Sequence, residues 1–384
     1  LRSRGLGDVY KRQQFPREFV RGMLTARGAA NSHTGILART LGVPAVSQLP
    51  VSAELHGRTA VLDGFSGTLT LDPDEQTLAE AAAKIAAQQA QREALRQLVS
   101  APSVTQDGHS IRLYANIAGT DDLPLLQESG AEGVGLLRSE FLYLGRSTYP
   151  TEDELFESYK TIVQAMDGRE IIIRTLDIGA DKQADYFDMP PEDNPALGLR
   201  AIRLCLTRPI LFQTQLCAIL RASRYGNVGV MFPMVTGPDE LHRLKQALAD
   251  AEDVLIARGE RFGPYRIGVM IETPAAVFMS GELAGEVDFF SIGTNDLTQY
   301  LLAMDRQNPN LAPFCDPHHP AILRAIRHTV ECAHQARCSV GICGELAADE
   351  DLTEAFLRMG VDELSVAPAR ILPLRQKIRS LTLG

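Results

Sequence analysis

The chain has 384 residues, of which 45% are hydrophobic and 22% are charged. This composition is typical of a packed globular protein and excludes a disordered tail, a collagen repeat and a coiled-coil rod. With 38 Lys and Arg against 48 Asp and Glu the formal charge is -10, so no concentrated basic surface is expected and nucleic acid is excluded as a partner. The length predicts two domains, or one large barrel with an appendage.

The sequence carries no sign of membrane insertion or secretion. No apolar run reaches the roughly 18 to 20 residues that a membrane span needs, and no basic segment followed by an apolar one opens the chain. A cytoplasmic location is therefore expected. The cysteines form no CxxC pair and lie in apolar segments, which predicts reduced thiols and not a disulfide framework or a zinc cluster.

Three segments precede the main body of the chain. Residues 1–13 lack helical or strand periodicity and resemble translated vector sequence, so we interpret them as a non-native leader. Residues 14–71 alternate short apolar runs with Gly-rich turns, which predicts a small β-rich domain with one helix. Residues 72–101 begin with Asp-Pro-Asp-Glu and are rich in Ala, Gln, Leu and Arg, which predicts a linker helix.

Residues 102–384 repeat an apolar run followed by an amphipathic stretch. Parallel strands that are buried on both faces look continuously apolar, so the repeat predicts an α/β fold and specifically a (β/α)8 TIM barrel. A doubly wound open sheet is the structural alternative. An eighth, weaker strand is expected within 195–202, and the seven clear strands are expected at 111–117, 133–137, 170–176, 228–235, 267–272, 287–293 and 339–343.

Charged or polar residues follow most of these apolar runs. Arg, Asp and Glu are rarely buried unless they are paired, so packing alone does not explain their repetition at these points. In a TIM barrel the carboxyl ends of the strands form the active-site face, and these side chains are expected to converge there. They are Arg138, Arg174, Asp177, Glu272, Asn295, Asp296, Arg306, Cys343 and Glu345.

This set of side chains indicates a phosphate-bearing ligand. Arginine binds carboxylate or phosphate through two parallel hydrogen bonds, and Glu272 and Asp296 supply the hard oxygen ligands that Mg²⁺ prefers. The expected ligand is a small, highly anionic phosphate ester. The alternative is that individual arginines form structural ion pairs with the carboxylates.

A second candidate centre is His33, in the turn Asn31-Ser32-His33-Thr34 before a helical stretch. A lone histidine is more often a structural or solvent-facing residue. At a helix N-terminus, however, a neutral imidazole is a competent nucleophile, and backbone donors there favour an added phosphoryl group.

Several motifs together resemble those of known enzymes. The turn around His33, followed by Leu41-Gly42-Val43-Pro44-Ala45-Val46, is similar to the phosphohistidine signature of the phosphoenolpyruvate (PEP)-utilising enzymes. Further segments resemble Enzyme I of the sugar phosphotransferase system, from about residue 19 to near residue 373. They are 135–142, 174–182, 272–276, 288–300 and 342–347.

The resemblance implies phosphoryl transfer from PEP to a histidine and then to a histidine phosphocarrier protein. It implies that His33 is phosphorylated, that Glu272 and Asp296 bind Mg²⁺, and that Cys343 protonates C3 of the enolate left behind. It also implies a substrate-binding set made of Arg138, Arg174, Arg200, Asn295, Asp296 and Arg306.

Departures from the family pattern lie at the turn and at the two ends. Two alanines, Ala29 and Ala30, precede the histidine turn where the family usually has glycines. The family's phosphocarrier-docking domain and its C-terminal dimerising segment are not recognised here. Residues 14–71 are therefore expected to be a partial mobile phosphohistidine domain, 102–384 a barrel truncated at its C-terminus, and a homodimer is expected for the full-length protein.

Three functional alternatives stay open at this point. Multidomain phosphoryl transfer proteins carry the same Enzyme I motifs. Pyruvate phosphate dikinase and PEP synthase share the histidine domain and the barrel, although residues 177–182 and Asp305-Arg306 resemble Enzyme I more closely. A catalytically incomplete fragment that serves as a scaffold is the alternative outside catalysis.

Overall fold

The structure is a computed structural model that describes residues 19–26, 38, 43–49, 51–179, 185–306 and 308–384. It divides into two compact units, Leu1–Ala94 and Leu95–Gly384, and each is described here by itself. Within the described residues, no helix combines the length and apolar character that crossing a membrane requires.

The first unit contains short strands and a long helix, α3. Strand β1 (Met23–Thr25) pairs in parallel with β2 (Ala45–Ser47), and β3 (Ala60–Asp63) pairs in antiparallel fashion with β4 (Thr68–Leu71). A short 3-10 helix, η2 (Ala53–Leu55), lies between β2 and β3.

Helix α3 (Glu75–Arg96) lies within the segment 72–101 that the sequence predicts as a linker helix, and it crosses from the first unit into the second. The Asp74 carboxylate accepts the backbone N–H of Thr77 at 2.8 Å, as expected at a helix start. The predicted domain boundaries themselves stay predictions.

The second unit is a closed barrel of parallel strands, which confirms the predicted α/β TIM-barrel fold and excludes the open sheet. Each strand pairs with the next along the chain, and the last pairs with the first. Apart from the eighth, the strands lie where the apolar runs predict them. They are β5 (Arg112–Ile117), β6 (Gly133–Arg138), β7 (Ile171–Arg174), β8 (Val228–Phe232), β9 (Tyr265–Ile271), β10 (Phe289–Ile292), β11 (Ser339–Ile342) and β12 (Glu363–Val366).

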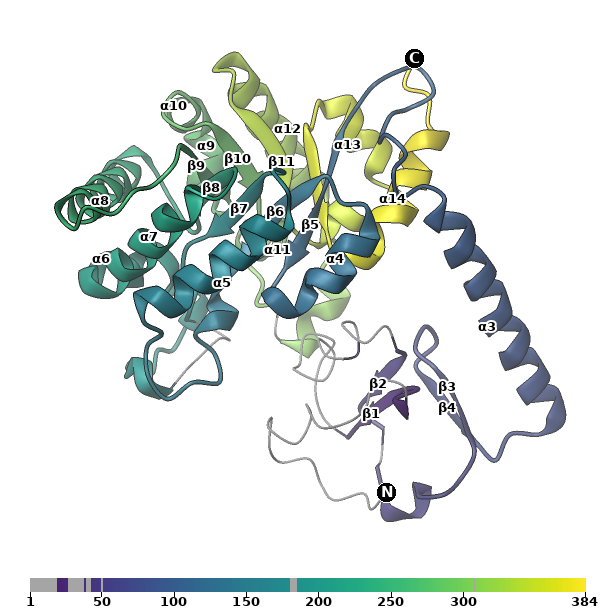
Figure 1. Cartoon of the computed structure of the whole chain (residues 1–384). Coiled ribbons are helices and arrows are strands. Elements are labelled where there is room, and N and C mark those ends of the chain that lie inside the picture. Colours follow the sequence, from purple (N-terminus) through teal and green to yellow (C-terminus); the bar gives the residue numbers. More distant parts are fainter. Residues whose placement is uncertain (1–18, 27–37, 39–42, 50, 180–184, 307) are drawn as a thin grey trace. The chain divides into compact units, whose positions relative to one another are not determined.

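Helices form the outer layer around these strands (Figure 1). The longer ones are amphipathic and bury one face; in α5, for example, Leu155, Tyr159 and Ile162 are buried. The helices of this layer are α4 (Leu123–Ser129), α5 (Glu152–Ala165), α6 (Ala201–Thr207), α7 (Pro209–Ser223), α8 (Pro238–Ala257), α9 (Pro274–Phe278), α10 (Ser280–Ala284), α11 (Thr294–Leu301), α12 (Pro320–Gln335), α13 (Thr353–Met359) and α14 (Pro368–Ser380).

The eighth strand is β12, so its predicted position within 195–202 is wrong. That segment forms a 3-10 helix, η6 (Pro195–Leu197), and then begins α6. The polar residues Glu363 and Ser365 alternate with the apolar Leu364 and Val366, so β12 lacks a continuous apolar run. A search for continuous apolar runs therefore does not detect β12.

The barrel interior is filled by side chains that alternate with outward-facing ones. Phe289 is a large inward residue, and its ring occupies space left by two glycines on β8 and β9. A Cβ atom on Gly268 would lie 2.2 Å from this ring, and one on Gly229 would lie 3.1 Å from it. Around Phe289 the interior cluster consists of Leu136, Ile172, Met231, Met270 and Cys343.

Strand β6 contains a bulge that reverses its alternation. Val134 and Leu137 pair with Ile171 and Ile173 of β7, so two residues of β6, Gly135 and Leu136, stand opposite one residue of β7. A bulge of this kind re-aims the side chains that follow it. Because Leu137 faces the outer helices and Leu136 the interior, Arg138 is directed toward the mouth of the barrel.

Candidate active site

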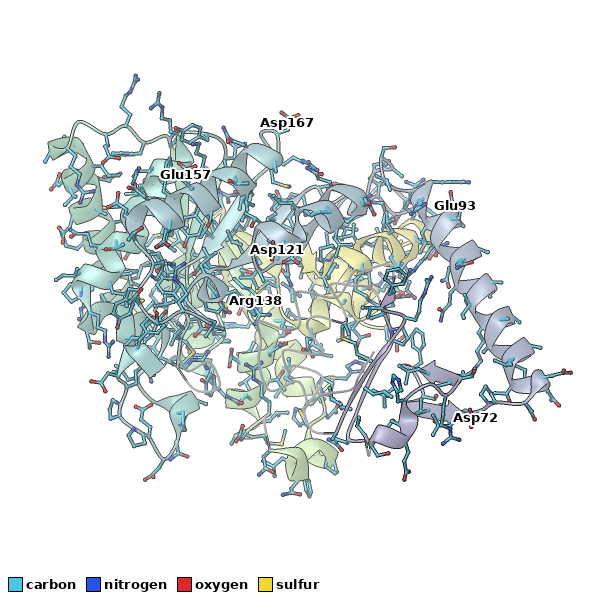
Figure 2. The ribbon with its side chains drawn as sticks, turned by 60° about the horizontal axis from the view of Figure 1, so that its bottom comes forward. Asp72, Glu93, Asp121, Arg138, Glu157 and Asp167 are labelled. Carbon is cyan, nitrogen blue, oxygen red and sulfur yellow. The ribbon has the colours of Figure 1, made fainter. Side chains whose placement is uncertain are left out.

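The arginines that the sequence predicts at strand ends lie in one connected group. Arg138 follows the bulge in β6, and Figure 2 marks its position. Its Nε donates to Glu140 Oε1 at 3.3 Å, and Arg174 at the end of β7 donates to the same oxygen through Nη2 at 2.7 Å. Arg174 Nη1 lies 3.2 Å from Asp177 Oδ2.

The group continues with alternating charge to the far side of the mouth. Arg200 Nη2 donates to Asp177 Oδ1 at 2.9 Å, and its Nη1 donates to Asp296 Oδ1 at 3.3 Å. Arg306 Nη2 lies 3.7 Å from the same Asp296 oxygen. We call this set the arginine–carboxylate arc; it consists of Arg138, Glu140, Arg174, Asp177, Arg200, Asp296 and Arg306.

The arc is buried at its centre and accessible at its ends. Side chains of Arg174 and Arg200 are 6% and 3% exposed, whereas those of Arg138 and Arg306 are 37% and 29% exposed. Burial alone would lower the pKa of Arg174, but the carboxylates of Glu140 and Asp177 raise it above the ordinary value. The buried guanidinium therefore stays charged, and the set carries one more arginine than carboxylates.

Glu272 extends the polar site beneath the arc. It follows β9 directly, is 1% exposed, and accepts the backbone N–H of Met234 at 2.7 Å through Oε1. Burial, together with the nearby carboxylates of Asp296 and Asp177, raises the pKa of Glu272 to about 8. A Cβ atom on Gly293 would lie 2.8 Å from Glu272 Oε2, so this oxygen borders the turn that leads to Asp296.

The pair Glu272 and Asp296 suits a divalent cation that is completed by other ligands. Among the described residues, no group of three or more His, Cys, Asp or Glu side chains is arranged to hold a metal ion. Mg²⁺, however, is commonly bound through one or two carboxylates together with substrate phosphate and water. Because Asp296 makes the ionisation of the buried Glu272 more costly, a cation bound between the two side chains would stabilise the ionised Glu272 carboxylate.

Cys343 follows β11 and faces the barrel interior. It is 5% exposed, and its Sγ lies 3.7 Å from the carbonyl oxygen of Ile292. Burial raises the pKa of the Cys343 thiol to about 12, so the group keeps its proton at neutral pH. A protonated thiol in this place is able to act as an acid.

Asn295 lies at the start of α11 and contacts the segment that follows Cys343. Its Oδ1 accepts the backbone N–H of Glu345 at 2.8 Å, which ties the loop after β11 to the loop after β10. Asn295, Asp296 and Arg306 come from one short segment of the chain. A hydrogen bond from the backbone N–H of Arg306 to the side chain of Gln299 holds this segment together.

His33 lies outside the described residues, so the structure gives no position for it. The remaining predicted site residues lie at the carboxyl ends of the barrel strands or in the loops and helices that follow them. Arg200, for example, immediately precedes α6.

Sequence reasoning missed several residues that support the arc. Glu140 is wholly buried and holds two of the arginines, and its place two residues after Arg138 was the available signal. Gln215 of α7 donates through Nε2 to Ser139 Oγ at 2.9 Å and accepts the N–H of Leu176 at 2.8 Å. No local signal marks Gln215, because the same helix has other polar residues, such as Gln213 and Thr214 directly before it.

Comparison with known proteins gives matches along nearly the whole chain. Residues 92–383 match the family model "PEP-utilising enzyme, PEP-binding domain", and residues 13–67 match "PEP-utilising enzyme, mobile domain". The chain is 44% identical over 372 residues to a phosphoenolpyruvate-protein phosphotransferase of Bacillus subtilis (strain 168), which covers 96% of this chain and 65% of that protein.

Two further relatives carry the same name. The protein of Geobacillus stearothermophilus is 44% identical over 371 residues, covering 96% of this chain and 64% of its own length. That of Staphylococcus carnosus (strain TM300) is 43% identical over 371 residues, covering 96% and 65%. The chain thus spans about 65% of the length of these relatives. With the match to the PEP-binding model covering most of its residues, the chain belongs to the family of PEP-utilising enzymes.

Proposed function

We propose that the chain transfers the phosphoryl group of PEP to a histidine and releases pyruvate, as the first step of a sugar phosphotransferase system. The observation that carries this proposal is the arginine–carboxylate arc above the buried Glu272. Its excess of positive charge suits a small trianion, and the names of the relatives identify the same donor. Phosphoryl transfer depends on positioning and charge neutralisation, which an ordered set of arginines supplies.

The arginines divide the work of binding. Arg138 and Arg306 are the accessible members, so they meet the ligand first, whereas the guanidinium groups of Arg174 and Arg200 are held in place by carboxylates. Guanidinium groups held in this way lose little conformational entropy when they bind a carboxylate or a phosphate. Asn295 and the backbone N–H of Asp296 add neutral donors to the same site.

Glu272 and Asp296 would hold Mg²⁺, which supplies charge neutralisation for the phosphate when it is bound. In the reaction, a histidine nitrogen attacks the phosphorus, the P–N bond forms, and the bond from phosphorus to the enol oxygen breaks. The electron pair of that bond stays with the enolate. Cys343 then gives its thiol proton to C3, which yields pyruvate, and the thiolate regains a proton from water.

His33 is the proposed phosphoryl acceptor, on the strength of its sequence motif and the match of residues 13–67 to the mobile-domain model. We further propose a histidine phosphocarrier protein as the next acceptor, a homodimer for the full-length protein, and a cytoplasmic location. The cytoplasmic location is supported by six cysteines that all remain free thiols, since disulfides are rare in the cytosol.

Labelling tests the proposed function. The chain is incubated with Mg²⁺ and PEP that carries a radioactive phosphate, and an acid-labile label on His33 is the expected result. His33→Ala should lose the label, and Glu272→Ala should lose it while the protein stays folded. A Glu272→Ala variant that labels at the parental rate would contradict the metal assignment.

The acceptor is tested in the same assay. Phosphocarrier protein is added to one portion of labelled chain, and nucleotide with inorganic phosphate to another. Transfer to the phosphocarrier supports the proposal, whereas transfer to nucleotide would support a dikinase-like reaction. A folded chain that takes up no label would indicate a non-catalytic scaffold.

A further inference from the structure

The barrel has a seam where β11 and β12 separate near the candidate active site. These two strands pair only through Gly341 with Glu363 and Ile342 with Leu364. The next residues along, Cys343 and Ser365, lie beyond the ladder, and their backbone carbonyl groups need other donors. Cys343 is the residue to which we assign the proton transfer.

Asn116 of β5 bridges this seam with its side-chain amide. Its Nδ2 donates to the carbonyl oxygen of Cys343 at 2.9 Å and to that of Ser365 at 3.0 Å. Its Oδ1 accepts the hydroxyl of Ser365 at 2.6 Å. Both amide protons and the amide oxygen are therefore engaged, and the side chain substitutes for the missing rung of the ladder.

The rest of the Cys343 segment is held from the β10 side. The N–H of Cys343 donates to the carbonyl oxygen of Ile292 at 3.1 Å. Gly344 packs so closely against Thr294 that a Cβ atom on it would lie 1.9 Å from the threonine hydroxyl oxygen. The peptide before Cys343 is thus anchored to β10 and the peptide after it to Asn116, so the pair of anchors sets the direction of the thiol.

We propose that Asn116 is a positioning residue for proton donation by Cys343, which it aims at one face of the enolate by holding the Cys343 carbonyl. The inference rests on the proposed function. Because the hydrogen bonds are made to the backbone, Asn116 acts on the thiol through geometry, and the arginines that bind phosphate are anchored elsewhere. Its loss should impair the proton step more than phosphoryl transfer.

The test separates the two steps in one reaction. The substrate is PEP with tritium placed stereospecifically at C3, the solvent is deuterium oxide, and Mg²⁺ is present. We measure the phosphoryl label on the protein, the rate of pyruvate formation, and the chirality of the pyruvate methyl group. Methyl chirality and the ratio of pyruvate to phosphoryl label do not depend on the folded fraction, so partial unfolding of a variant does not mimic the effect.

Four proteins are compared with the parent. Asn116→Ala removes all three hydrogen bonds of the side chain, and Asn116→Asp keeps the shape but loses the two that Nδ2 donates. Asn227→Ala is the matched control, because Asn227 Nδ2 also donates to a backbone carbonyl, that of Gly168, which precedes β7 at the opposite end of the barrel. Cys343→Ser tests the proposed proton donor itself.

In both Asn116 variants we expect the ratio of pyruvate formation to phosphoryl labelling to fall about tenfold, since small misplacements of a reacting group have effects of this size or larger. Methyl chirality should be lost, and Asn227→Ala should retain parental values of both readouts. Parental chirality and ratio in the Asn116 variants would overturn the inference, as would an equal loss in Asn227→Ala. If Cys343→Ser keeps the methyl chirality, Cys343 is not the proton donor, and the inference about Asn116 is wrong as well. If Cys343→Ser loses the chirality and both Asn116 variants keep it, Cys343 remains the proposed donor and only the inference about Asn116 is wrong.

Discussion

Single carboxylates decide how the arginines of this site are held. Glu140 is 0% exposed and serves both Arg138 and Arg174, and Asp177 serves Arg174 and Arg200. Removal of one partner from a buried ion pair leaves an uncompensated charge in a medium of low dielectric constant. The carboxylates that sequence reasoning left without a role are therefore the residues on which the arginines depend.

The substitution Glu140→Gln tests this dependence. We expect it to lower the free energy of unfolding by about 3 kcal/mol, because it removes one of the two counter-charges of the buried Arg174. Glu157→Gln is the control, since Glu157 pairs with Lys160 on the exposed face of α5 and its loss should cost less than about 0.5 kcal/mol. Denaturant titration of both variants measures the difference, and equal values would contradict a stabilising role for the buried charge.

Glu363 provides a pH-dependent prediction at the opposite end of the barrel. It is 5% exposed, and burial raises its pKa from 4.5 to about 8, although Arg112 nearby opposes the shift. Between these two values the unfolded chain releases the proton and the folded chain keeps it. Ionisation of Glu363 therefore favours unfolding as the pH rises from about 4.5 to 8, and the loss is complete above pH 8.

Glu363→Gln removes this titration. Relative to the parent, the variant should gain stability by up to about 1.4 kcal/mol for each pH unit across that window, with no relative gain below it. Thermal or denaturant unfolding at several pH values gives the comparison. Glu354→Gln on the surface of α13 measures what any lost surface carboxylate contributes, and the same pH profile in both variants would show the prediction to be wrong.

The bulge in β6 is the element that presents Arg138 to the site. It needs a glycine, because a Cβ atom at Gly135 would lie 2.4 Å from both Glu363 Oε1 and Ser365 Oγ of β12. The bulge of β6 thus packs against β12 and at the same time sets the direction of Arg138.

Gly135→Ala should therefore disturb both stability and binding. We expect a loss of about 1 to 3 kcal/mol from overpacking, together with weaker PEP binding because Arg138 follows the displaced strand. Gly119→Ala is the control, since a Cβ atom there meets nothing within 4 Å and the backbone is extended, with φ of 172°. Unfolding and calorimetric titration with PEP measure the two effects; unchanged values for both in Gly135→Ala would contradict the constraint.

At the scale of the whole molecule, the two units differ in how much apolar surface they bury. Among the described residues of Leu1–Ala94, the buried apolar side chains are Ala38 and Val46, whereas Leu95–Gly384 contains the extensive barrel core. Units with separate cores unfold separately unless their interface is large.

Scanning calorimetry should resolve two transitions, with the smaller unit unfolding at the lower temperature. Addition of PEP with Mg²⁺ should raise the transition temperature of the barrel alone. Ligand at a hundred times its dissociation constant should increase the free energy of unfolding of the barrel by about 2.7 kcal/mol. A single transition would contradict independent units. A ligand shift confined to the lower transition would contradict a binding site on the barrel.

Local features of the amino-acid sequence were enough to predict the barrel and most of the candidate site. Most buried parallel strands are continuous apolar runs, and the residue that ends such a run lies at the carboxyl face of the barrel whatever the packing around it. Arg138, Arg174, Glu272 and Cys343 could therefore be found by local reading. The motif around His33 was also local, although its position stays outside the described residues.

Which side chains contact one another depends on the closure of the barrel and could not be predicted from local sequence. The strand β12 is polar on its inner face, so its place depends on closure against β5 and not on its own pattern. Glu140, Gln215 and Asn116 each contact a partner that lies between 34 and 249 residues away in the chain. Contacts between residues so far apart leave no local periodicity in the sequence, because they arise only when the closed sheet brings its strand ends together.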